Sequence, residues 1–422
     1  MALLFISLLG CFAIGVPVFA ALGIASVLAL TTQRIDLLSV PQNLFEALDS
    51  FPLMAIPFYI LAGNLMQTGG ISRRLMHLAN ALVGWFRGGL GAASVLTCMF
   101  FATMSGSSSA TTAAVGGIMI PAMEKKGYPK NFAAASVAVS GELGAIIPPS
   151  LPMIVYGLVA NVSVGSMFIA GILPGILIGV TLMLTIVSVA IAKGFDDVES
   201  MSVSQWARQV LKTLAESGFA LMMPLIILGG IYSGVFTATE ASVVAVVYGL
   251  IVGVFIYREL RWSDLAKIFK DAAVMTGTIM MIVGFASLFA YVLATNQVPQ
   301  HFGRMIASIA GGPLGFLLLA NVLLFVVGMF MEALAAIVIL APILAPIATA
   351  YGIDPIHFGI VMIVNIAIGM VTPPVGVNLF IASQISGLPL EKLIPPLLLF
   401  LVVLVFNVLL ISYIPGISLA FL

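Results

Sequence analysis

Hydroxyl side chains are concentrated in one short stretch of an otherwise apolar sequence. Seven of its ten residues are Ser or Thr: Thr103-Met104-Ser105-Gly106-Ser107-Ser108-Ser109-Ala110-Thr111-Thr112. A single hydroxyl in an apolar helix can bond back to its own backbone, but seven exceed that need. Hydroxyl and carbonyl oxygens suit a small hard cation, and a helix beginning after Gly106 would offer its N-terminus to a carboxylate. The stretch therefore predicts a site for a cation and an anion.

Two Pro-Pro pairs would supply further oxygen ligands. They lie in the segments Gly144-Ala145-Ile146-Ile147-Pro148-Pro149-Ser150 and Gly369-Met370-Val371-Thr372-Pro373-Pro374-Val375. Each proline lacks an amide hydrogen and breaks the helical hydrogen bond to the carbonyl four residues earlier, so carbonyl oxygens become available. A kinked helix without a binding role is the alternative interpretation. Because freed carbonyls occur twice in a similar context, the pattern favours two matched ion sites.

Three carboxylates lie within apolar segments, where an ionisable residue is a functional candidate by default. They are Glu142, Glu240 and Glu332. Glu240 follows Thr237 by three residues, so it could equally be an acid that stabilises the start of a helix. No Lys or Arg lies within these segments. An anionic substrate would therefore be held by helix N-termini, hydroxyls and bound cations rather than by an arginine clamp.

The elements that hold these residues are predicted to be membrane helices. Of 422 residues, 62% are apolar and 8% are charged, with a mean hydropathy of +1.23. Soluble domains are roughly 45–50% apolar and about 25% charged. Several apolar runs approach the ~20 residues that span a bilayer, so the chain reads as an all-α polytopic membrane protein rather than a soluble enzyme or a nucleic-acid binder. The runs do not alternate as barrel strands would, and no phosphate-binding loop indicates a nucleotide.

The segment between Arg87 and Lys125 is predicted to be a re-entrant hairpin. It is too short for two crossings, which need about 40 residues. A single crossing would place Arg73 and Arg87 opposite the other positive loops, against the rule that such loops stay inside. With a hairpin, 14 of the 16 Lys and Arg residues fall inside, and only Arg34 and Arg304 fall outside.

The remaining apolar segments predict a second hairpin and seven crossings. The second hairpin, at 313–350, is entered from outside, and the outer segments 31–50 and 299–312 are expected to be short loops. Residues 1–30 form either one long helix or two short helices broken near Pro17. The crossings are expected at 132–161, 165–192, 217–236, 238–257, 272–296, 356–385 and 393–415. Three charged stretches read as interfacial helices that anchor the chain or brace a moving domain: 71–87, 199–215 and 260–270.

An internal repeat relates the two halves of the chain. A shift of 225 residues superposes Pro121 on Pro346, Gly127 on Gly352, Gly144 on Gly369, and Pro148-Pro149 on Pro373-Pro374. Glycine and proline set backbone shape, so their coincidence in one register indicates a shared fold. Because the first hairpin enters from inside and the second from outside, the repeats are inverted, which is the architecture of secondary transporters.

The ordered motif set resembles the large membrane subunit (M subunit) of TRAP transporters, the tripartite ATP-independent periplasmic carriers. The resemblance covers essentially the whole chain and is carried by Ser105-Gly106-Ser107-Ser108-Ser109-Ala110-Thr111, Ile118-Met119-Ile120-Pro121-Ala122-Met123, Ile147-Pro148-Pro149-Ser150, Met331-Glu332-Ala333-Leu334-Ala335 and Thr372-Pro373-Pro374-Val375-Gly376. It implies an elevator-type fold of the ion-transporter superfamily in the bacterial inner membrane. It further implies sodium symport, a small membrane subunit, a periplasmic substrate-binding protein, and a carboxylate substrate such as a C4-dicarboxylate or sialic acid.

The resemblance also implies which residues bind. One sodium ion would be held by Ser105, Ser108, Gly144, Ile147 and Pro149, and a second by Gly328, Gly369, Thr372 and Val375. The substrate would contact Ser107, Ser108, Thr111 and Glu332. Family members often carry Asp where this chain has Glu332. No nucleotide or organic cofactor is expected, and the partners besides the two proteins are membrane lipids rather than nucleic acid.

The expected division of the chain follows the repeats. The first repeat is expected to contain scaffold helices and an interfacial arm at 1–88, followed by the first hairpin and broken helix of a transport domain at 89–165. A connecting helix and a cytoplasmic interfacial segment follow at 166–216. The second repeat is expected to contain scaffold helices at 217–312, the second hairpin and broken helix at 313–390, and a C-terminal helix at 391–422. A stand-alone sodium–dicarboxylate symporter or antiporter of the same superfamily is the alternative function. An intramembrane enzyme would need a nucleophile–base or metal-ligand set, which the sequence does not place among its helices.

Overall fold

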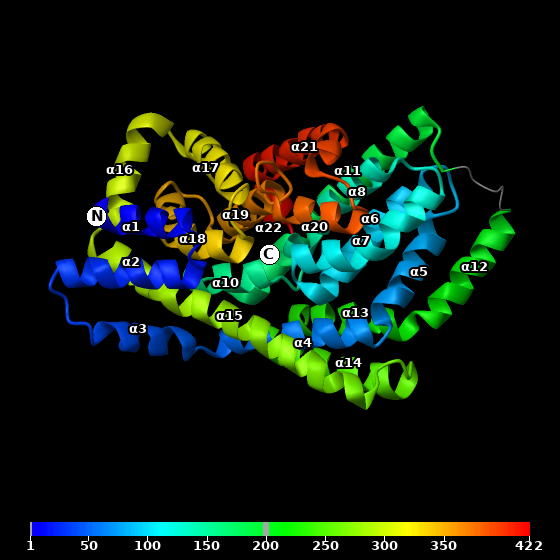
Figure 1. Ribbon diagram of the computed structural model, residues 1–422, viewed down its shortest axis with the longest axis horizontal. Coiled ribbons are helices and arrows are strands. Elements are labelled where there is room, and N and C mark those ends of the chain that lie inside the picture. Colours follow the sequence, from blue (N-terminus) through cyan, green and yellow to red (C-terminus); the bar gives the residue numbers. More distant parts are fainter. Residues whose placement is uncertain (1, 197–201) are drawn as a thin grey trace.

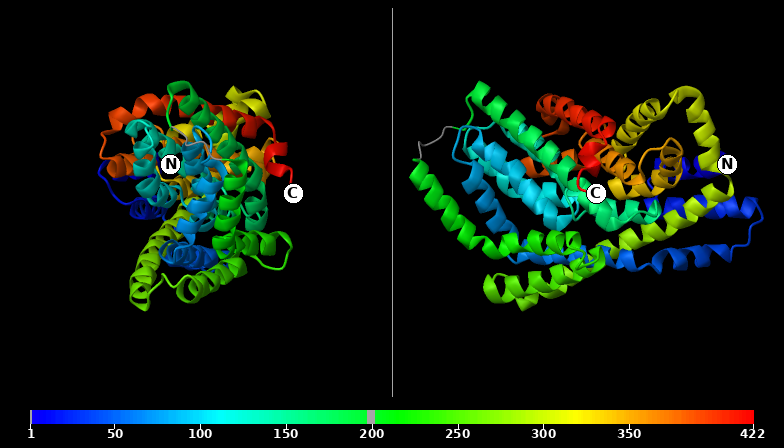
Figure 2. Two further views of the ribbon diagram at one scale, coloured as in Figure 1. Left: turned by 90° about the vertical axis from the view of Figure 1, so that its right-hand side faces the viewer. Right: turned by 180° about the vertical axis from the view of Figure 1, so that it is seen from behind.

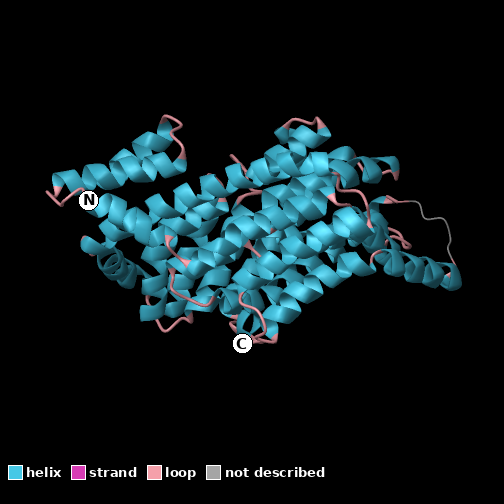
Figure 3. Ribbon diagram, turned by 90° about the horizontal axis from the view of Figure 1, so that it is seen from below, coloured by secondary structure: helices cyan, strands magenta, loops and turns pink. Residues whose placement is uncertain are grey.

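Helices make up the described part of the protein, and no strand occurs there. The computed structural model describes residues 2–196 and 202–422 (Figure 1). The turns between helices are short (Figure 3). The prediction of an all-α protein is therefore confirmed.

The first half of the chain contains thirteen elements, including one 3-10 helix, η1. They are α1 (Ala2–Ala13), α2 (Val18–Thr32), α3 (Ser39–Leu48), η1 (Phe51–Met54), α4 (Ala55–Thr68), α5 (Ile71–Val83), α6 (Gly89–Ser105), α7 (Ser108–Lys125), α8 (Lys130–Gly141), α9 (Leu143–Ile146), α10 (Leu151–Val159), α11 (Val164–Lys193) and α12 (Val203–Glu216). The second half includes one π-helix, η2. Its elements are α13 (Gly218–Tyr232), α14 (Ala238–Ile251), η2 (Val252–Ile256), α15 (Trp262–Thr295), α16 (Val298–Ala310), α17 (Pro313–Gly328), α18 (Ala333–Ala350), α19 (Pro355–Gly369), α20 (Val377–Ser386), α21 (Leu390–Tyr413) and α22 (Gly416–Leu419).

Membrane-spanning length is reached by five helices of the described chain, or by up to nine spans if each sharply bent helix pair counts as one. The five are α11, α14 with η2, α15, α18 and α21. Length and apolar composition alone define them. They agree with the predicted polytopic arrangement, because a bilayer core of about 30 Å needs roughly 20 helical residues.

The element order repeats as the sequence predicts. Helices α7 and α18 begin 225 residues apart, and so do α8 and α19. The next pairs, α10 with α20 and α11 with α21, begin 226 residues apart. The Gly and Pro register therefore reflects a repeated series of helices.

Each half contains a helical hairpin with a very short tip. Only Gly106 and Ser107 separate α6 from α7, and Gly106 adopts a left-handed conformation with φ of +60°, which suits glycine. The second tip, residues 329–332, joins α17 to α18. The four helices have 16–18 residues, or about 24–27 Å at 1.5 Å per residue. Both predicted hairpins are thus present.

Each hairpin is followed by a helix that breaks at a Pro-Pro pair. The first break, residues 147–150, bends the chain by 43° between α9 and α10. The second, residues 370–376, separates α19 from α20. Both Pro-Pro peptide bonds are cis. The prediction of two Pro-broken helices is confirmed.

Two local expectations need correction, and the structure decides the alternative left open for residues 1–30. Residues 260–270 do not form a separate interfacial helix, because α15 continues without a proline from Trp262 to Thr295. The outer segments 31–50 and 299–312 are not plain loops, since they contain α3 and α16, whose apolar residues recur at helical spacing. Residues 1–30 form two helices, α1 and α2, that pack against each other.

The other two helices that are predicted to be interfacial lie side by side. Helix α5 buries Ile71, Leu75 and Leu78, as its periodicity predicts. Helix α12 covers most of 199–215, although residues 199–201 lie outside the described part. The indole Nε1 of Trp206 on α12 donates a hydrogen bond of 3.1 Å to the carbonyl of Ala81 on α5. The two helices therefore form one arm at one end of the molecule (Figure 1).

The longest helix, α15, connects distant parts of the fold. It contacts α2, α3, α4 and α18 along its length. In Figure 1 it runs diagonally along one face of an elongated molecule, and the end-on view in Figure 2 is correspondingly narrow. Its 34 residues correspond to about 51 Å, which exceeds the ~30 Å bilayer core. The charged turns after Trp262 therefore extend beyond the apolar core.

Candidate functional site

The two hairpin tips meet in a cavity of about 340 Å³. The first tip contributes Gly106 to Ser109, and the second contributes Glu332 to Ala335. Further walls come from α2, α10 and α15, through Val18, Leu151, Pro152, Met275, Thr278, Ile279 and Ile282. Residues far apart in the sequence therefore line one site, and the only charged side chain among its lining residues is Glu332.

Ser107 caps the N-terminus of α7 at the first tip. Its hydroxyl accepts a hydrogen bond of 3.4 Å from the Ala110 amide, and its carbonyl accepts one of 3.1 Å from the Thr111 amide. The first four amides of a helix have no partner within the helix, so those of Ser108 and Ser109 remain for other partners. Thr111 does not line the cavity. It is buried behind the tip, where its hydroxyl lies 2.8 Å from that of Ser105.

Glu332 occupies the equivalent position at the second tip. Its carboxylate accepts a hydrogen bond of 2.9 Å from the Leu334 amide and also faces the amides of Ala333 and Ala335. The side chain is exposed to the cavity and borders a second, mainly apolar cavity of about 810 Å³ against α1. The Glu332 carboxylate thus holds the backbone of the second tip through these amides and also lines the cavity between the two tips.

The residues expected around the first sodium ion lie where the first tip meets the first helix break. The Leu151 amide donates a hydrogen bond of 3.1 Å to the Gly106 carbonyl. A Cβ atom at Gly144 would collide with the carbonyl oxygen of Ser107 and the hydroxyl of Thr111. Glycine at 144 is therefore what lets the two backbones approach. Ser108 is 3% exposed, and its hydroxyl lies 3.9 Å from Met370 Sδ on the other broken helix.

The residues expected around the second sodium ion lie at the corresponding contact in the second repeat. Gly328 and Gly369 touch through their backbones, and a Cβ at Gly328 would lie 2.7 Å from the Ile366 carbonyl oxygen. The Gly376 amide donates a hydrogen bond of 3.3 Å to the Met329 carbonyl, next to half-buried Val375. The Thr372 hydroxyl is nearly buried and donates to the Ile368 carbonyl at 2.9 Å. Both contacts therefore join a hairpin tip to a break, with backbone and hydroxyl oxygens close together.

Glu142 connects the two broken helices instead of lining the cavity. It is fully buried, and its Oε1 accepts a hydrogen bond of 2.6 Å from Asn378 Nδ2 on α20. The Glu142 Oε2 and Asn378 Oδ1 atoms are buried without a hydrogen-bond partner among the described residues. Sequence reasoning identified the acid but missed Asn378, whose signal is an amide at the start of an apolar helix just after Pro-Pro. It also missed Thr278, a single hydroxyl on the cavity-facing side of α15.

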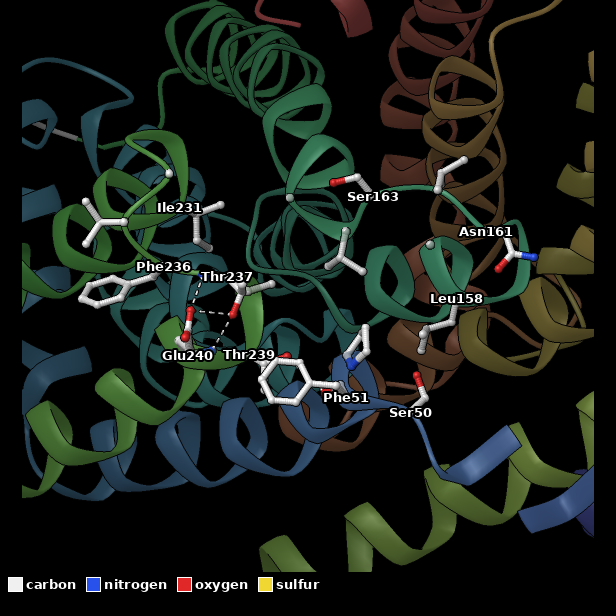
Figure 4. Close-up of a pocket in the computed structure, with 18 residues that line it drawn as sticks. Ser50, Phe51, Leu158, Asn161, Ser163, Ile231, Phe236, Thr237, Thr239 and Glu240 are labelled. Carbon is white, nitrogen blue, oxygen red and sulfur yellow. Dashed lines mark hydrogen bonds between the residues drawn. The ribbon is translucent and has the colours of Figure 1, made fainter. Parts of the chain in front are cut away.

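Glu240 is explained by helix capping. It forms a reciprocal capping box with Thr237 at the start of α14: the Thr237 amide and hydroxyl each donate to Glu240 Oε2 at 2.8 Å, and the Glu240 amide donates to the Thr237 hydroxyl at 3.2 Å (Figure 4). The pair borders a cavity of about 710 Å³ between the α13–α14 turn, η1 and the α10–α11 turn. Of the two roles that the sequence leaves open, the structural one fits this geometry.

The sequence and fold both have known counterparts. The family described as the tripartite ATP-independent periplasmic transporter, DctM component, matches residues 5–417. The C4-dicarboxylate TRAP transporter large permease protein DctM of Pseudomonas aeruginosa is 47% identical, covering 90% of this chain and 88% of the relative. The sialic acid TRAP transporter large permease protein SiaM of Vibrio cholerae is 35% identical, covering 91% and 90%. The solved structure of the YdaH transporter of Alcanivorax borkumensis shares the fold, with a TM-score of 0.63, 15% identity, and coverage of 90% and 87%.

These matches run through both hairpins and both broken helices, so they concern the elements that build the central cavity and not a peripheral part of the chain. The apolar helices place the same elements in a bilayer. The chain therefore belongs to the DctM family of tripartite ATP-independent periplasmic transporters, as a large permease component that passes several times through the bacterial inner membrane.

Proposed function

We propose that this chain imports an organic acid together with sodium ions by an elevator movement of its hairpins. The observation that carries the proposal is the cavity shared by both tips, because each tip also contacts a helix break rich in backbone oxygens. A site built from two inverted halves near the bilayer midplane suits alternating access. No catalytic residue is proposed.

The proposed substrate is a carboxylate, such as a C4-dicarboxylate, sialic acid or a related organic acid. The names of the Pseudomonas and Vibrio relatives support these classes. The free amides at the start of α7, with the hydroxyls of Ser107 and Ser108, would bind the carboxylate. Thr111 would support the tip from behind. Glu332 would meet a donor group of the substrate, or organise its own tip.

The proposed sodium ions act as co-substrates that complete the site. The first would be held by Ser105, Ser108, Gly144, Ile147 and Pro149, and the second by Gly328, Gly369, Thr372 and Val375. These residues offer hydroxyl and carbonyl oxygens, the ligands that hard cations prefer. With no Lys or Arg among the lining residues of the cavity, bound sodium would supply the positive charge that makes a carboxylate bind. Coupling follows, because neither solute is bound well without the other.

The proposed moving unit comprises the hairpins and broken helices, at 89–165 and 313–390. Contacts between each tip and its break would let this unit move as one body. The proposed scaffold, 1–88 and 217–312, includes α15, which lines the cavity through Thr278. The substrate would therefore bind between the moving and fixed parts, as an elevator requires.

The proposed partners are a small membrane subunit, which stiffens the scaffold, and a soluble periplasmic protein, which delivers the substrate. The word tripartite in the family description supports a three-part assembly. A stand-alone sodium–dicarboxylate symporter or antiporter is the alternative function.

Uptake into proteoliposomes tests the proposal. Uptake is expected only with a sodium gradient, the small subunit and a loaded binding protein together. Omitting each component in turn provides the controls. Sodium-driven uptake of free substrate by this chain alone would support the stand-alone alternative instead.

A further inference from the structure

A cavity at the outer end of the second hairpin is separate from the substrate site. It has a volume of about 470 Å³ and lies between α16 and the end of α18. It shares no lining residue with the cavity between the tips. Its lining residues are Pro299, Gln300, Gly303, Arg304, Pro346, Ile347, Ala350 and Tyr351. Arg304 is one of the two basic residues that the sidedness rule places outside.

The polar groups of this cavity are mainly donors without partners. The Arg304 guanidinium forms no ion pair among the described residues. The Tyr351 hydroxyl is buried without a hydrogen-bond partner in the same part of the chain. The Gln300 amide adds further donors, and no lining residue is acidic. Such a set suits an anion, because Arg304 and Gln300 are exposed at the cavity and a ligand oxygen would give the buried Tyr351 hydroxyl the partner that it lacks.

The corresponding arm on the inner side is different. Helix α5, the counterpart of α16 in the first repeat, carries Arg73 and Arg74. Both guanidinium groups lie 2.7 Å from Glu259 Oε1, and Arg74 also stacks over the Tyr257 ring at 3.5 Å. Both arginines of α5 therefore have a protein carboxylate as a partner. Arg304 of α16, the helix called the outer arm below, has no such partner among the described residues, so its charge is available to a ligand.

The rest of the cavity is apolar. Proline, isoleucine and alanine side chains form its walls. Helix α16 also exposes Met305 and Ile309, at 53% and 68%, as an interfacial helix does. A Cβ at Gly303 would lie 3.6 Å from Ile347, so the two helices are in contact beside the cavity. A charged group beside an apolar wall matches the junction between a phospholipid headgroup and its acyl chain.

We propose that an anionic phospholipid binds here, between the outer arm and the second hairpin. Its phosphate accepts hydrogen bonds from Arg304 and Tyr351, since a guanidinium matches phosphate geometry. Its acyl chain lies against Pro346 and Ile347. A zwitterionic lipid binds less well, because no carboxylate lines the cavity to meet its ammonium group. The lipid thereby connects α16 of the scaffold to α18 of the hairpin.

Native mass spectrometry of the purified permease with its small subunit tests this site. The protein is titrated with phosphatidylglycerol and, separately, with phosphatidylethanolamine. Wild type is expected to retain one phosphatidylglycerol about tenfold more tightly than phosphatidylethanolamine. Arg304→Gln should abolish that preference, and Tyr351→Phe should weaken phosphatidylglycerol binding several-fold. Arg34→Gln is the matched control, because Arg34 is the other outer arginine and does not line the cavity.

Equal retention of the two lipids by wild type, or an unchanged preference in Arg304→Gln, would overturn the proposal. Displacement of the lipid by glycerol 3-phosphate at similar concentration would identify a soluble phosphate site instead. If Arg304→Gln left lipid binding intact and weakened only binding of the periplasmic protein, the surface would be a protein-docking site. Thermal unfolding in detergent checks that each variant folds. If Arg304→Gln does not fold, Tyr351→Phe still tests the proposal, because it removes only one oxygen atom.

Discussion

Ser107 and Glu332 occupy equivalent positions in the two repeats, yet they cap their helices differently. Ser107 caps α7 with a neutral hydroxyl and leaves two amides without helical partners, whereas the Glu332 carboxylate already faces three amides of α18. The two tips therefore offer different chemistry to a substrate between them. The first is ready to receive an anion, and the second presents one.

Removing one hydroxyl from either proposed ion site should raise the sodium requirement for uptake. Ser105→Ala and Thr372→Ala each remove one oxygen from a site with several, which should weaken sodium binding by roughly 1–3 kcal/mol. The sodium dependence of uptake in proteoliposomes measures this. Thr103→Ala is the matched control, because it removes a hydroxyl of the same helix as Ser105 at a position that is not among the proposed ion ligands. Unchanged sodium dependence in both variants would mean that the ion sites lie elsewhere.

Replacing Asn378 should destabilise the protein more than neutralising its partner. Asn378→Ala leaves the buried Glu142 carboxyl without its hydrogen bond, at a cost of about 1–3 kcal/mol. Glu142→Gln keeps an acceptor for the Asn378 amide and should be close to wild type. Thermal unfolding in detergent compares the two variants. Equal losses would show that the hydrogen bond itself contributes little.

Glu240 should matter for stability and not for transport. Glu240→Ala removes one half of the capping box and should lower the unfolding temperature slightly, because the Thr237 amide loses its acceptor. Glu240→Gln keeps an acceptor and should lose less. Unfolding temperature and sodium-dependent uptake are measured on the same preparations. A changed sodium dependence at normal stability would give Glu240 a role that its geometry does not suggest.

The first hairpin is predictable from the sequence because its turn-forming glycine lies where the sidedness of the flanking basic residues requires the chain to turn back. Gly106 marks the first tip, and the sidedness of Arg73 and Lys125 requires the chain to turn there. The predicted division of α15 is wrong, since charged residues after Trp262 resemble an interfacial segment whether or not the helix continues. A charged segment between two apolar runs indicates only that it lies outside the membrane, so α3 and α16, each with a single charged residue, are not distinguished from loops by charge.

The first hairpin predicts that its two ends lie on one side of the membrane. Arg73→Cys and Lys125→Cys should both react with an impermeant thiol reagent from the cytoplasmic side. Both positions are exposed in the folded chain. The background for this experiment lacks the native thiols Cys11 and Cys98. Labelling of the two positions from opposite sides would show that the chain crosses the membrane between them, which would contradict the re-entrant hairpin.

How the helices assemble around the site was not predictable from local sequence. The cavity includes Val18 and Thr278, which lie in ordinary apolar helices and carry no motif. Their placement depends on packing between α2, α15 and the hairpins, which periodicity alone does not specify. The motif residues were predictable because glycine, proline and hydroxyl patterns describe backbone shape directly.

Joining the first tip to α15 should stop transport if the hairpins move against a fixed scaffold. Ser109→Cys and Thr278→Cys place one thiol on each side of the cavity. A short bifunctional thiol reagent should abolish uptake in the double variant. Each single variant with the reagent, and the double variant without it, provide the controls. Undiminished uptake after verified cross-linking would argue against the elevator movement.

The two repeats share an order of helices but not a conformation. The break spans four residues in the first copy, at 147–150, and seven in the second, at 370–376. If inversion relates the inward-open and outward-open forms, exchanging the backbone angles of the two copies would generate the opposite form. A single static structure of this chain would then contain, in the mismatch between its halves, a template for both ends of its transport cycle.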